Sequence, residues 1–424
     1  IHPASRILGH QSMKRMRFWW WIAPALLCGP LHGGAQTGFY INDEKPQVEI
    51  PFEYVNNFIV LNIVVQGRLP LRFIYDTGAE HTLICQKEIG AMLNLQYERE
   101  FRVKGTDMET ELTAYLVRRM RLDLPGKAHA PAEDLLIMED DFFRFEEYAG
   151  IQINGILAGK VFSRYLIQIN YERRSITLML RSEFKNKPGE YEELPIELFR
   201  NKVYIQAAIS VSTQEEASVK LLVDTGAGLP LLLFDDTHPL LKPPEHVIPN
   251  NIAMGLGGYL TGFVGRTQRV GIGAQEQRDV VTFFQSIDSL KYLEYMNGRN
   301  GLIGNVLLSR YIVVLDYLGS RLLLKPTRHY NRRFNYDRSG LSLYASSPYL
   351  NRYFVQKVMP GSPAAEAGIQ SGDEILRVGI LGANVYTLDE LQRKLSNPRV
   401  KRLKLTVRRG DQKIRLLLTL RDLI

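Results

Sequence analysis

Phe73-Ile74-Tyr75-Asp76-Thr77-Gly78-Ala79 and Leu221-Leu222-Val223-Asp224-Thr225-Gly226-Ala227 are the two stretches that decide the fold. In each, three apolar residues lead into Asp-Thr-Gly-Ala, which predicts a buried strand that ends at the aspartate and turns at the glycine. The threonine can hydrogen-bond across to a partner backbone. A single copy has a plain alternative, a strand-end turn with a solvated aspartate. Two copies call for a common explanation.

The sequence around each stretch is repeated as well. Ile50-Pro51-Phe52-Glu53 precedes the first stretch, and Leu194-Pro195-Ile196-Glu197 precedes the second. Asn154-Gly155-Ile156-Leu157 follows the first, and Asn300-Gly301-Leu302-Ile303 follows the second. The offset is 148 residues between the aspartates (224 − 76) and 146 between the Asn-Gly pairs (300 − 154). A near-constant offset indicates an internal duplication.

Both copies consist of short runs of Val, Ile, Leu, Tyr and Phe broken by Gly, Pro or Asn, which predicts a mainly β fold. We expect two homologous β-lobes, over residues 40–185 and 188–326. Helices are expected only over short segments such as residues 88–95 and 306–310.

The two aspartates form the candidate catalytic pair. If the copies pack about a pseudo-twofold axis, Asp76 and Asp224 meet there, and two adjacent carboxylates share one proton. The ionised member can take a proton from water as the water attacks an amide carbonyl, while the protonated member stabilises the oxyanion. Thr77, Gly78, Thr225 and Gly226 are the expected supports of the two loops. This chemistry requires no metal and no cofactor.

These motifs also carry a family resemblance. Asp76-Thr77-Gly78-Ala79-Glu80-His81-Thr82 resembles the Asp-Thr-Gly-Ala-Asp-Asp-Thr run of retropepsins. Gly301-Leu302-Ile303-Gly304-Asn305-Val306-Leu307-Leu308 resembles the block that crosses behind the catalytic loop in pepsin-like and retropepsin-like aspartic proteases. The resemblance implies two retropepsin-like β-barrel lobes that form one bilobal aspartic protease, with Asp76 and Asp224 as its dyad. The whole chain resembles bacterial aspartyl proteases that carry a C-terminal PDZ domain.

The sequence departs from that family at several positions. Ala158 stands where the second copy has Gly304, and its methyl group could shift Asp76. Glu80 and His81 replace an acidic pair, so Glu80 is either a substrate-positioning carboxylate or a local salt-bridge partner. Alanines follow both Asp-Thr-Gly triplets where pepsins have a hydroxyl, which predicts a pH optimum less acidic than that of pepsin.

Each copy also offers a hairpin that could cover the dyad. Val103-Lys104-Gly105-Thr106-Asp107 is the first candidate, and Ala253-Met254-Gly255-Leu256-Gly257-Gly258-Tyr259 is the second. Gly105, Gly257 and Gly258 are therefore candidate substrate-binding positions. Each stretch is either a gating flap or a plain surface hairpin.

The last part of the chain closely resembles a PDZ domain, which we place at residues 339–424 after a linker at 327–338. The motif is Gly361-Ser362-Pro363-Ala364-Ala365-Glu366-Ala367-Gly368-Ile369 followed by Gly372-Asp373-Glu374-Ile375-Leu376. Residues 388–395 have helical spacing and would form one wall of the groove. The candidate peptide-binding residues are Gly340, Leu341, Ser342 and Leu343, whose amides hold a peptide carboxylate in such domains. The alternative is a module that only docks on the lobes.

The first 35 residues resemble a secretory signal peptide that starts at Met13. Lys14, Arg15 and Arg17 precede an apolar run of eleven residues that ends at Cys28, and cleavage is expected after Ala35. The alternatives are an uncleaved anchor and a lipoprotein site at Cys28. We expect an exported, periplasmic or cell-envelope protein with no membrane span in its mature chain.

Charge and the remaining residues limit the other classes of function. The formal net charge of +8 comes from the last part of the chain: residues 327–424 hold 18 basic and 8 acidic residues, whereas residues 36–326 hold 31 and 37. No aromatic–basic interleaving accompanies the basic residues, so nucleic acid is not an expected partner. The expected partners are protein or peptide substrates and a C-terminal peptide ligand of the PDZ domain.

Two other classes remain to be weighed against a protease of this kind. A peptide-binding scaffold that keeps the fold without turnover is the main alternative, although such a protein has no need of two facing carboxylates. A serine protease is the second, but the sequence has no Gly-x-Ser-x-Gly elbow. The histidines show no spacing that suggests a metal site or a triad.

Overall fold

The computed structural model describes residues 38–104, 111–141, 143–212, 215–255, 258–287, 296–346 and 348–424, with backbone only for residues 103–104 and 250–261. They belong to one structural unit, residues 36–424. The predicted signal segment, Met13 and Cys28 lie outside the described residues. No helix in the described ranges is long and apolar enough to cross a membrane.

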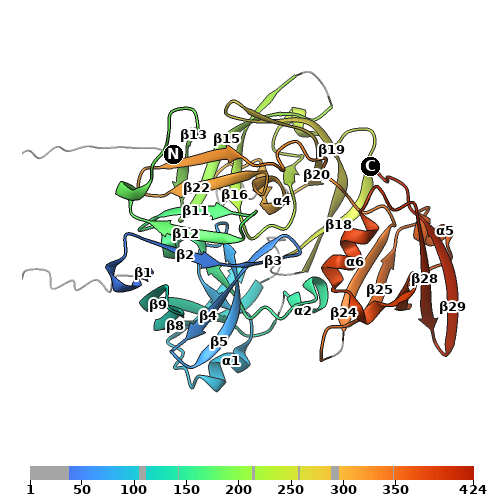
Figure 1. Ribbon diagram of the computed structural model, residues 1–424, viewed down its shortest axis with the longest axis horizontal. Coiled ribbons are helices and arrows are strands. Elements are labelled where there is room, and N and C mark those ends of the chain that lie inside the picture. Colours follow the sequence, from blue (N-terminus) through green and yellow to red (C-terminus); the bar gives the residue numbers. More distant parts are fainter. Residues whose placement is uncertain are drawn as a thin grey trace, which may run out of the picture. The chain divides into compact units, whose positions relative to one another are not determined.

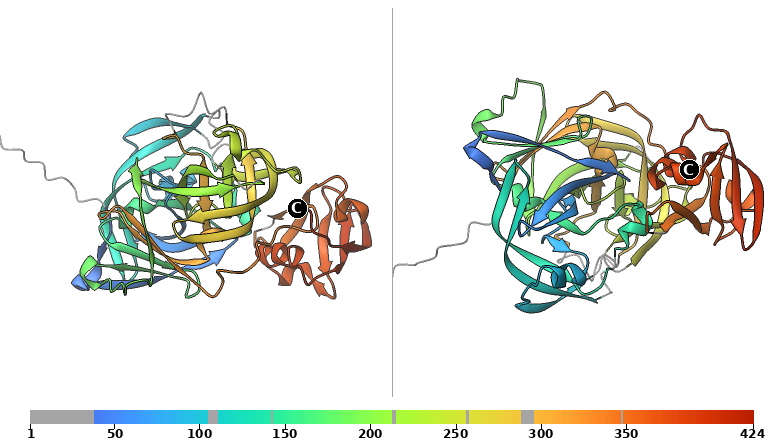
Figure 2. Two further views of the ribbon diagram at one scale, coloured as in Figure 1. Left: turned by 90° about the horizontal axis from the view of Figure 1, so that it is seen from above. Right: turned by 60° about the horizontal axis from the view of Figure 1, so that its bottom comes forward.

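The first copy of the repeat, called the first repeat below, forms one curled sheet (Figures 1 and 2). Its strands are β1 (Tyr40–Ile41), β3 (Glu53–Val55), β4 (Phe58–Val65), β5 (Leu69–Asp76), β6 (Leu83–Ile84), β7 (Arg99–Lys104), β8 (Glu111–Leu124), β9 (Ala128–Met138) and β10 (Gly155–Ala158). The order is β1-β9-β6-β10-β5-β4-β8-β7, with β3 paired to β4. Because β8 also pairs with β9, the sheet closes on itself like a barrel.

The second copy, called the second repeat, forms a sheet of the same kind. Its strands are β14 (Glu197–Phe199), β15 (Lys202–Ser210), β16 (Ala217–Asp224), β17 (Leu231–Phe234), β18 (Ile248–Gly255), β19 (Gly258–Ile272), β20 (Gln275–Gln285) and β21 (Gly301–Gly304). The order is β14-β15-β16-β21-β17-β20-β19-β18, and a further β15–β19 pairing closes it. The mainly β prediction is therefore confirmed.

The duplication in the sequence is also a duplication in strand pairing. β10 runs parallel to β5 and places Ala158 opposite Asp76, and β21 runs parallel to β16 and places Gly304 opposite Asp224. β10 is antiparallel to β6, as β21 is to β17. The two aspartates therefore stand at equivalent ends of equivalent strands.

A third sheet is shared by both repeats. Its strands are β2 (Gln47–Pro51), β11 (Leu166–Asn170), β12 (Ser175–Met179), β13 (Glu192–Pro195), β22 (Tyr311–Asp316) and β23 (Arg321–Pro326), in the order β13-β23-β22-β11-β12-β2. The equivalent strands β11 and β22 pair antiparallel in its middle. This pairing relates the repeats by a local twofold, and one hydrophobic core extends through both.

Asp316, at the end of β22, joins the repeats electrostatically. Its buried carboxylate accepts hydrogen bonds from Arg181 of the first repeat, from Arg321 Nε (2.9 Å) and from the Gly319 amide (2.8 Å). Burial raises its pKa, but these donors outweigh burial and hold the pKa below its ordinary 3.8. Asp316 therefore contributes stability that is present above the unfolded-state pKa and is lost as the pH falls through the lower, folded-state pKa.

Asp316→Asn should lower the free energy of unfolding by about 2–3 kcal/mol at neutral pH, less than for a fully buried pair because both arginines are partly exposed. Urea unfolding at neutral pH and at pH values below 3.8 measures it, and the difference from wild type should shrink in acid. The exposed Asp43→Asn is the control. An undiminished difference in acid would show that the carboxylate charge is not the cause.

The helices within the described residues are few and short, as expected. They are α1 (Lys87–Met92), α2 (Phe145–Ala149), α4 (Asn305–Leu308), α5 (Pro363–Glu366) and α6 (Leu388–Leu395), with 3₁₀ turns η1 (Asn42–Glu44), η2 (Gly159–Phe162), η3 (Arg181–Glu183), η4 (Pro239–Leu241) and η5 (Ala383–Val385). The prediction for residues 388–395 is confirmed. The predicted helix 88–95 ends earlier because Asn94 is left-handed (φ 55°) and closes the last turn. The helix predicted at 306–310 is α4.

The remaining strands form a separate sheet, called the C-terminal module. They are β24 (Leu341–Ser346), β25 (Arg352–Val358), β26 (Glu374–Val378), β27 (Leu381–Gly382), β28 (Arg402–Arg409) and β29 (Gln412–Thr419), in the order β24-β25-β26-β28-β29 with β27 on β26. α6 begins with a capping box between Thr387 and Glu390 and buries one leucine face in the module's own core.

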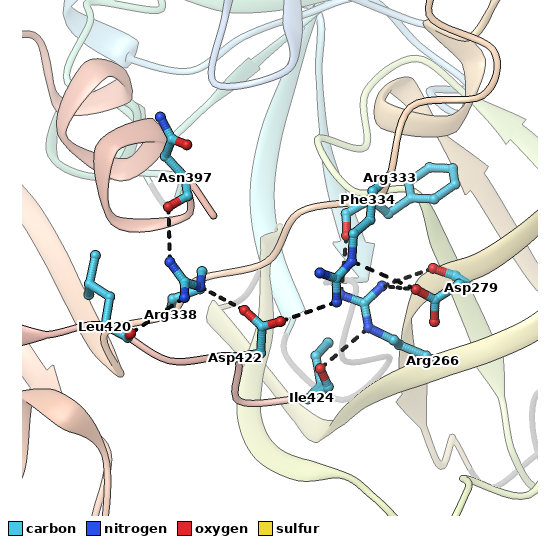
Figure 3. A network of polar contacts seen from close by, with 9 residues as sticks. All are labelled: Arg266, Asp279, Arg333, Phe334, Arg338, Asn397, Leu420, Asp422 and Ile424. Atoms are coloured by element: carbon cyan, nitrogen blue, oxygen red, sulfur yellow. Dashed lines mark hydrogen bonds and ion pairs between the residues drawn. The ribbon is translucent and has the colours of Figure 1, made fainter. Parts of the chain in front are cut away.

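The segment predicted as a linker is packed rather than solvated. Phe334 is buried under the Arg310 guanidinium, 4.3 Å from its ring centroid. Figure 3 shows Asp422 bound by Arg338 (2.7 Å) and Arg333 (3.2 Å), while Arg266 of β19 contacts Phe334 O (3.2 Å). The polar composition of this segment therefore reflects a network of arginines and not a free tether.

Candidate active site

The two Asp-Thr-Gly triplets meet where the repeats join, and their threonines hold them together. Thr77 Oγ1 donates to Val223 O (2.6 Å), and Thr225 Oγ1 donates to Tyr75 O (2.8 Å). Each hydroxyl also accepts from the other threonine's backbone amide, at 3.0 Å in both directions. Both threonines are fully buried. This reciprocal set fixes the two loops against each other.

The two carboxyl groups lie face to face across this junction. Asp76 Oδ1 accepts from the amides of Gly78 (2.7 Å) and Ala79 (3.0 Å), and Asp224 Oδ1 accepts from Gly226 (2.8 Å). A Cβ atom on Gly78 would lie 2.7 Å from Asp224 Cγ, and one on Gly226 would lie still closer to Asp76. Glycine is thus required at both places so that each carboxyl can approach the other repeat.

Burial and mutual repulsion change the acidity of the pair. Burial and the facing Asp224 carboxylate raise the pKa of Asp76 well above its ordinary 3.8. Burial also raises the pKa of Asp224, but Arg299, a hydrogen bond from the Asp76 carboxyl and the Gly226 amide lower it. The pair therefore shares one proton, and the Arg299 charge beside Asp224 favours the negative charge there.

Two cations at the dyad were not found from the sequence. Arg299 and Lys202 both interact with Asp224, and burial lowers the pKa of Lys202. Both come from the second repeat. The equivalent of Lys202 is Phe58, since both follow two left-handed turn residues between paired strands. Lys202 could have been identified from the sequence by aligning these two turns.

The blocks behind the two triplets differ between the repeats. A Cβ atom on Gly304 would lie 2.6 Å from Ala227 O, so the second repeat has no room for a methyl group there. In the first repeat Ala158 is accommodated, and its amide donates to Thr82 Oγ1 (3.2 Å). Asp76 pairs with Ala158 in the same register as Asp224 with Gly304. The methyl group therefore does not change the strand register at Asp76.

Glu80 lies between the two repeats at the edge of the site. Its carboxylate is 3.9 Å from Arg200 Nη1 of the second repeat and 3.7 Å from His81 Nε2. It also lines the cleft that contains both aspartates. The ion pair favours the salt-bridge interpretation of Glu80, and a role in positioning substrate stays a prediction.

A cleft of about 1790 Å³ opens over the dyad. β7 and β8 form one predicted hairpin and β18 and β19 the other. Gly105 and Gly257 lie outside the described residues, and Gly258 starts β19, described by its backbone only. The two hairpins exist as predicted, and their function as flaps stays a prediction.

The loop predicted to hold a peptide carboxylate is partly engaged within the chain. The half-buried Asp337 carboxylate accepts from the amides of Ser339 (3.0 Å) and Gly340 (2.6 Å), and the Leu341 amide donates to Ser339 Oγ (3.1 Å). Ser342 and Leu343 line the cleft together with Gly340 and Leu341. Peptide binding by Gly340, Leu341, Ser342 and Leu343 stays a prediction, and the amides of Gly340 and Leu341 are already engaged by the chain itself.

Comparisons with known proteins identify the last part of the chain. A family model of the PDZ domain matches residues 354–409. No curated protein matches the chain. Among solved structures, the chain is similar to the aspartic proteinase from Irpex lacteus, with 14% identity and a TM-score of 0.44, covering 66% of this chain and 98% of that chain. A likeness of this size carries no argument about the repeats, whereas the family match shows that this chain contains a PDZ domain.

Proposed function

We propose that this protein is an aspartic endopeptidase that hydrolyses peptide bonds with a water activated between Asp76 and Asp224. The observation that carries the proposal is the reciprocal set of threonine hydrogen bonds, which holds two half-buried carboxyls face to face in a large cleft. Two facing carboxyls cost free energy because both are desolvated and repel each other. A fold that holds the two carboxyls together despite this unfavourable free energy is suited to general acid–base catalysis.

The asymmetry of the pair assigns its roles. Ionised Asp224 removes a proton from the water as its oxygen bonds to the carbonyl carbon, and Asp76 gives its proton to the carbonyl oxygen. The resulting gem-diol then collapses: Asp224 returns its new proton to the amide nitrogen, the C–N bond breaks, and a hydroxyl proton of the diol goes back to Asp76. The dyad ends as it began, and no covalent enzyme intermediate forms.

Export and peptide recognition complete the proposal. The signal-like segment at residues 13–35 supports export to the periplasm or cell envelope. The PDZ domain supports binding of a peptide or a partner protein, because such domains add a peptide strand to a sheet edge.

The test of this function is cleavage of a mixed peptide library by the chain from residue 36 onward, followed by mass spectrometry. The expected result is a set of new termini with a recurrent pattern of flanking residues. A complete lack of cleavage over a wide pH range would favour the scaffold, the alternative that keeps the fold without turnover.

The assignment of the charge to Asp224 predicts a shift in pH dependence. Arg299 lowers the pKa of Asp224, so Arg299→Gln should raise it and move the acid limb of the kcat/KM profile to higher pH. The control is Arg68→Gln, an exposed arginine of the β4–β5 turn, which should leave the limb in place. An unchanged acid limb in Arg299→Gln would mean that Asp224 is not the ionised member.

A further inference from the structure

The groove between β24 and α6 of the PDZ domain holds a segment of the chain's own first repeat. α2 packs against β24 (Figure 1). Gly150, the residue after α2, lies between the two walls: a Cβ atom there would be 2.8 Å from Leu388 Cβ of α6 and 3.7 Å from Ala345 Cβ of β24. Tyr148 Oη accepts a hydrogen bond from Gln356 of β25 (3.2 Å). A peptide strand added to β24 would need this same space.

The conformation of this segment places its C-terminal end, Gly150, in the groove. Phe145 anchors α2 to the first repeat, with its ring 5.0 Å from Phe143 and 6.0 Å from Phe58. The helix is bounded by left-handed residues at both ends, Arg144 (φ 46°) and Gly150 (φ 64°). Glycine suits position 150 twice, by its backbone angle and by its approach to Leu388. The carboxylate end of the groove is also occupied from within, by Asp337.

The same segment contacts a turn that supports the second catalytic loop. The Ala149 carbonyl accepts from Asn56 Nδ2 (2.7 Å), and the Asn56 backbone amide donates to Asp389 of α6. The next residue, Asn57, donates through Nδ2 to Gly228 O (3.0 Å), four residues after Asp224. The PDZ groove, α2 and the Asp224 loop are therefore connected through one turn, Asn56 and Asn57.

We propose that the PDZ groove is a peptide site with an internal ligand, the segment from Phe145 to Gly150, and that a peptide strand binding to β24 displaces it and releases Asn56. The fitting partner is an extended peptide with a small or apolar residue where Gly150 faces Leu388 and Ala345. Because Asn57 contacts the Asp224 loop, peptide binding should change how that loop is supported. This effect on activity rests on the proposed function. The displacement of the segment from the groove does not depend on it.

The test uses the chain from residue 36 onward with Asp76→Asn, so that a probe is not cut. The probe is the synthetic peptide of residues 143–153, acetylated and amidated. Gly150→Ala adds a methyl group against Leu388 and should weaken the internal contact. The matched control is Gly126→Ala, which has a similar backbone angle (φ 68°) and open space around it.

Gly150→Ala should bind the probe at least about tenfold more tightly than the parent, because a larger fraction of the grooves is open. Hydrogen exchange should be faster at residues 145–149 and also at residues 56–58. Gly126→Ala should match the parent in both readouts. Equal probe binding in all three proteins, or faster exchange at 145–149 without any change at 56–58, would overturn the proposal.

A second variant keeps the test decisive if Gly150→Ala unfolds. Gly150→Cys with Leu388→Cys brings two Cβ atoms to 2.8 Å, so they need to separate by only about 1 Å to reach the usual disulfide spacing of about 3.8 Å. Cys85 is buried and does not compete. The oxidised form should lose probe binding and the reduced form should regain it, whereas equal binding in both forms would contradict an internal ligand. In the double-cysteine protein with Asp76 intact, a loss of peptidase activity would bear on the proposed function and not on the displacement of the segment.

Discussion

Replacing Asp76 or Asp224 by asparagine should lower kcat/KM for a peptide substrate by at least about a thousandfold. Asparagine has nearly the shape of aspartate, but it can neither carry the shared proton nor take one from water. The amides of Gly78 and Gly226 still find an oxygen acceptor, so the loops should keep their positions. Steady-state kinetics on a peptide identified by library cleavage measures the effect.

The control for this experiment is Asp123→Asn, a carboxylate of the first repeat that pairs with Arg121 on the surface (2.8 Å). It should stay within about twofold of the wild-type kcat/KM, since surface pairs contribute little. If either dyad variant kept more than about a tenth of the activity, its aspartate would not take part in the proton transfers and the mechanism proposed here would be wrong.

Thr225→Val should lower the free energy of unfolding by about 2–5 kcal/mol. The substitution keeps the shape but removes a hydroxyl that donates to Tyr75 O and accepts from the Thr77 amide. Both backbone groups then stay buried without a partner, at about 1–3 kcal/mol each. Because the same contacts position the carboxyls, kcat should also fall, by about tenfold or more. Urea unfolding and kinetics on the same preparations measure the two effects.

Thr225→Ser is the matched control because it keeps the hydroxyl and removes only a methyl group. It should recover most of the stability and most of kcat. If serine were as destabilising as valine, the methyl packing and not the hydrogen bonds would hold the loops. Thr77→Val tests the same contact from the other repeat and should give a similar loss, since its hydroxyl makes the equivalent bonds.

The duplicated sequence was enough to predict that two aspartates meet, because duplication constrains both copies to one pairing pattern. The near-constant offset placed Asp76 and Asp224 at equivalent strand ends, and the structure pairs them in the same register with β10 and β21. The PDZ domain was predictable for a related reason: its capped helix and following strand form a local motif, and the family match covers that motif.

Features that break the symmetry were not predictable in the same way. Arg299 and Lys202 occur in one repeat alone, and although aligning the two turns marks Lys202 as a difference from Phe58, the effect of both cations on Asp224 depends on packing between distant strands. The Arg200–Glu80 pair joins residues 120 positions apart (200 − 80) and has no sequence signature. Of these contacts, Arg299 favours the negative charge on Asp224, a preference that the motif leaves open.

The occupied PDZ groove is the other feature that the sequence does not show. α2 has only five residues and begins and ends at left-handed residues, so its hydrophobic periodicity is too short to read. Asp337 lies in a stretch that reads as a polar linker, yet its carboxylate accepts hydrogen bonds from the Ser339 and Gly340 amides. In both cases a local pattern gave no indication of a tertiary partner.

The most direct test of the central claim, one proton shared by Asp76 and Asp224, is the pH dependence of kcat/KM for the wild-type protein. The account predicts a bell-shaped profile: activity falls in acid as Asp224 gains a proton, and falls again at higher pH as Asp76 loses its own. Because the pKa of each group is raised, the pH optimum should lie above 3.8, the ordinary pKa of an aspartate. A profile that stays flat, or that keeps rising into alkaline pH, would contradict the shared proton and with it the proposed mechanism.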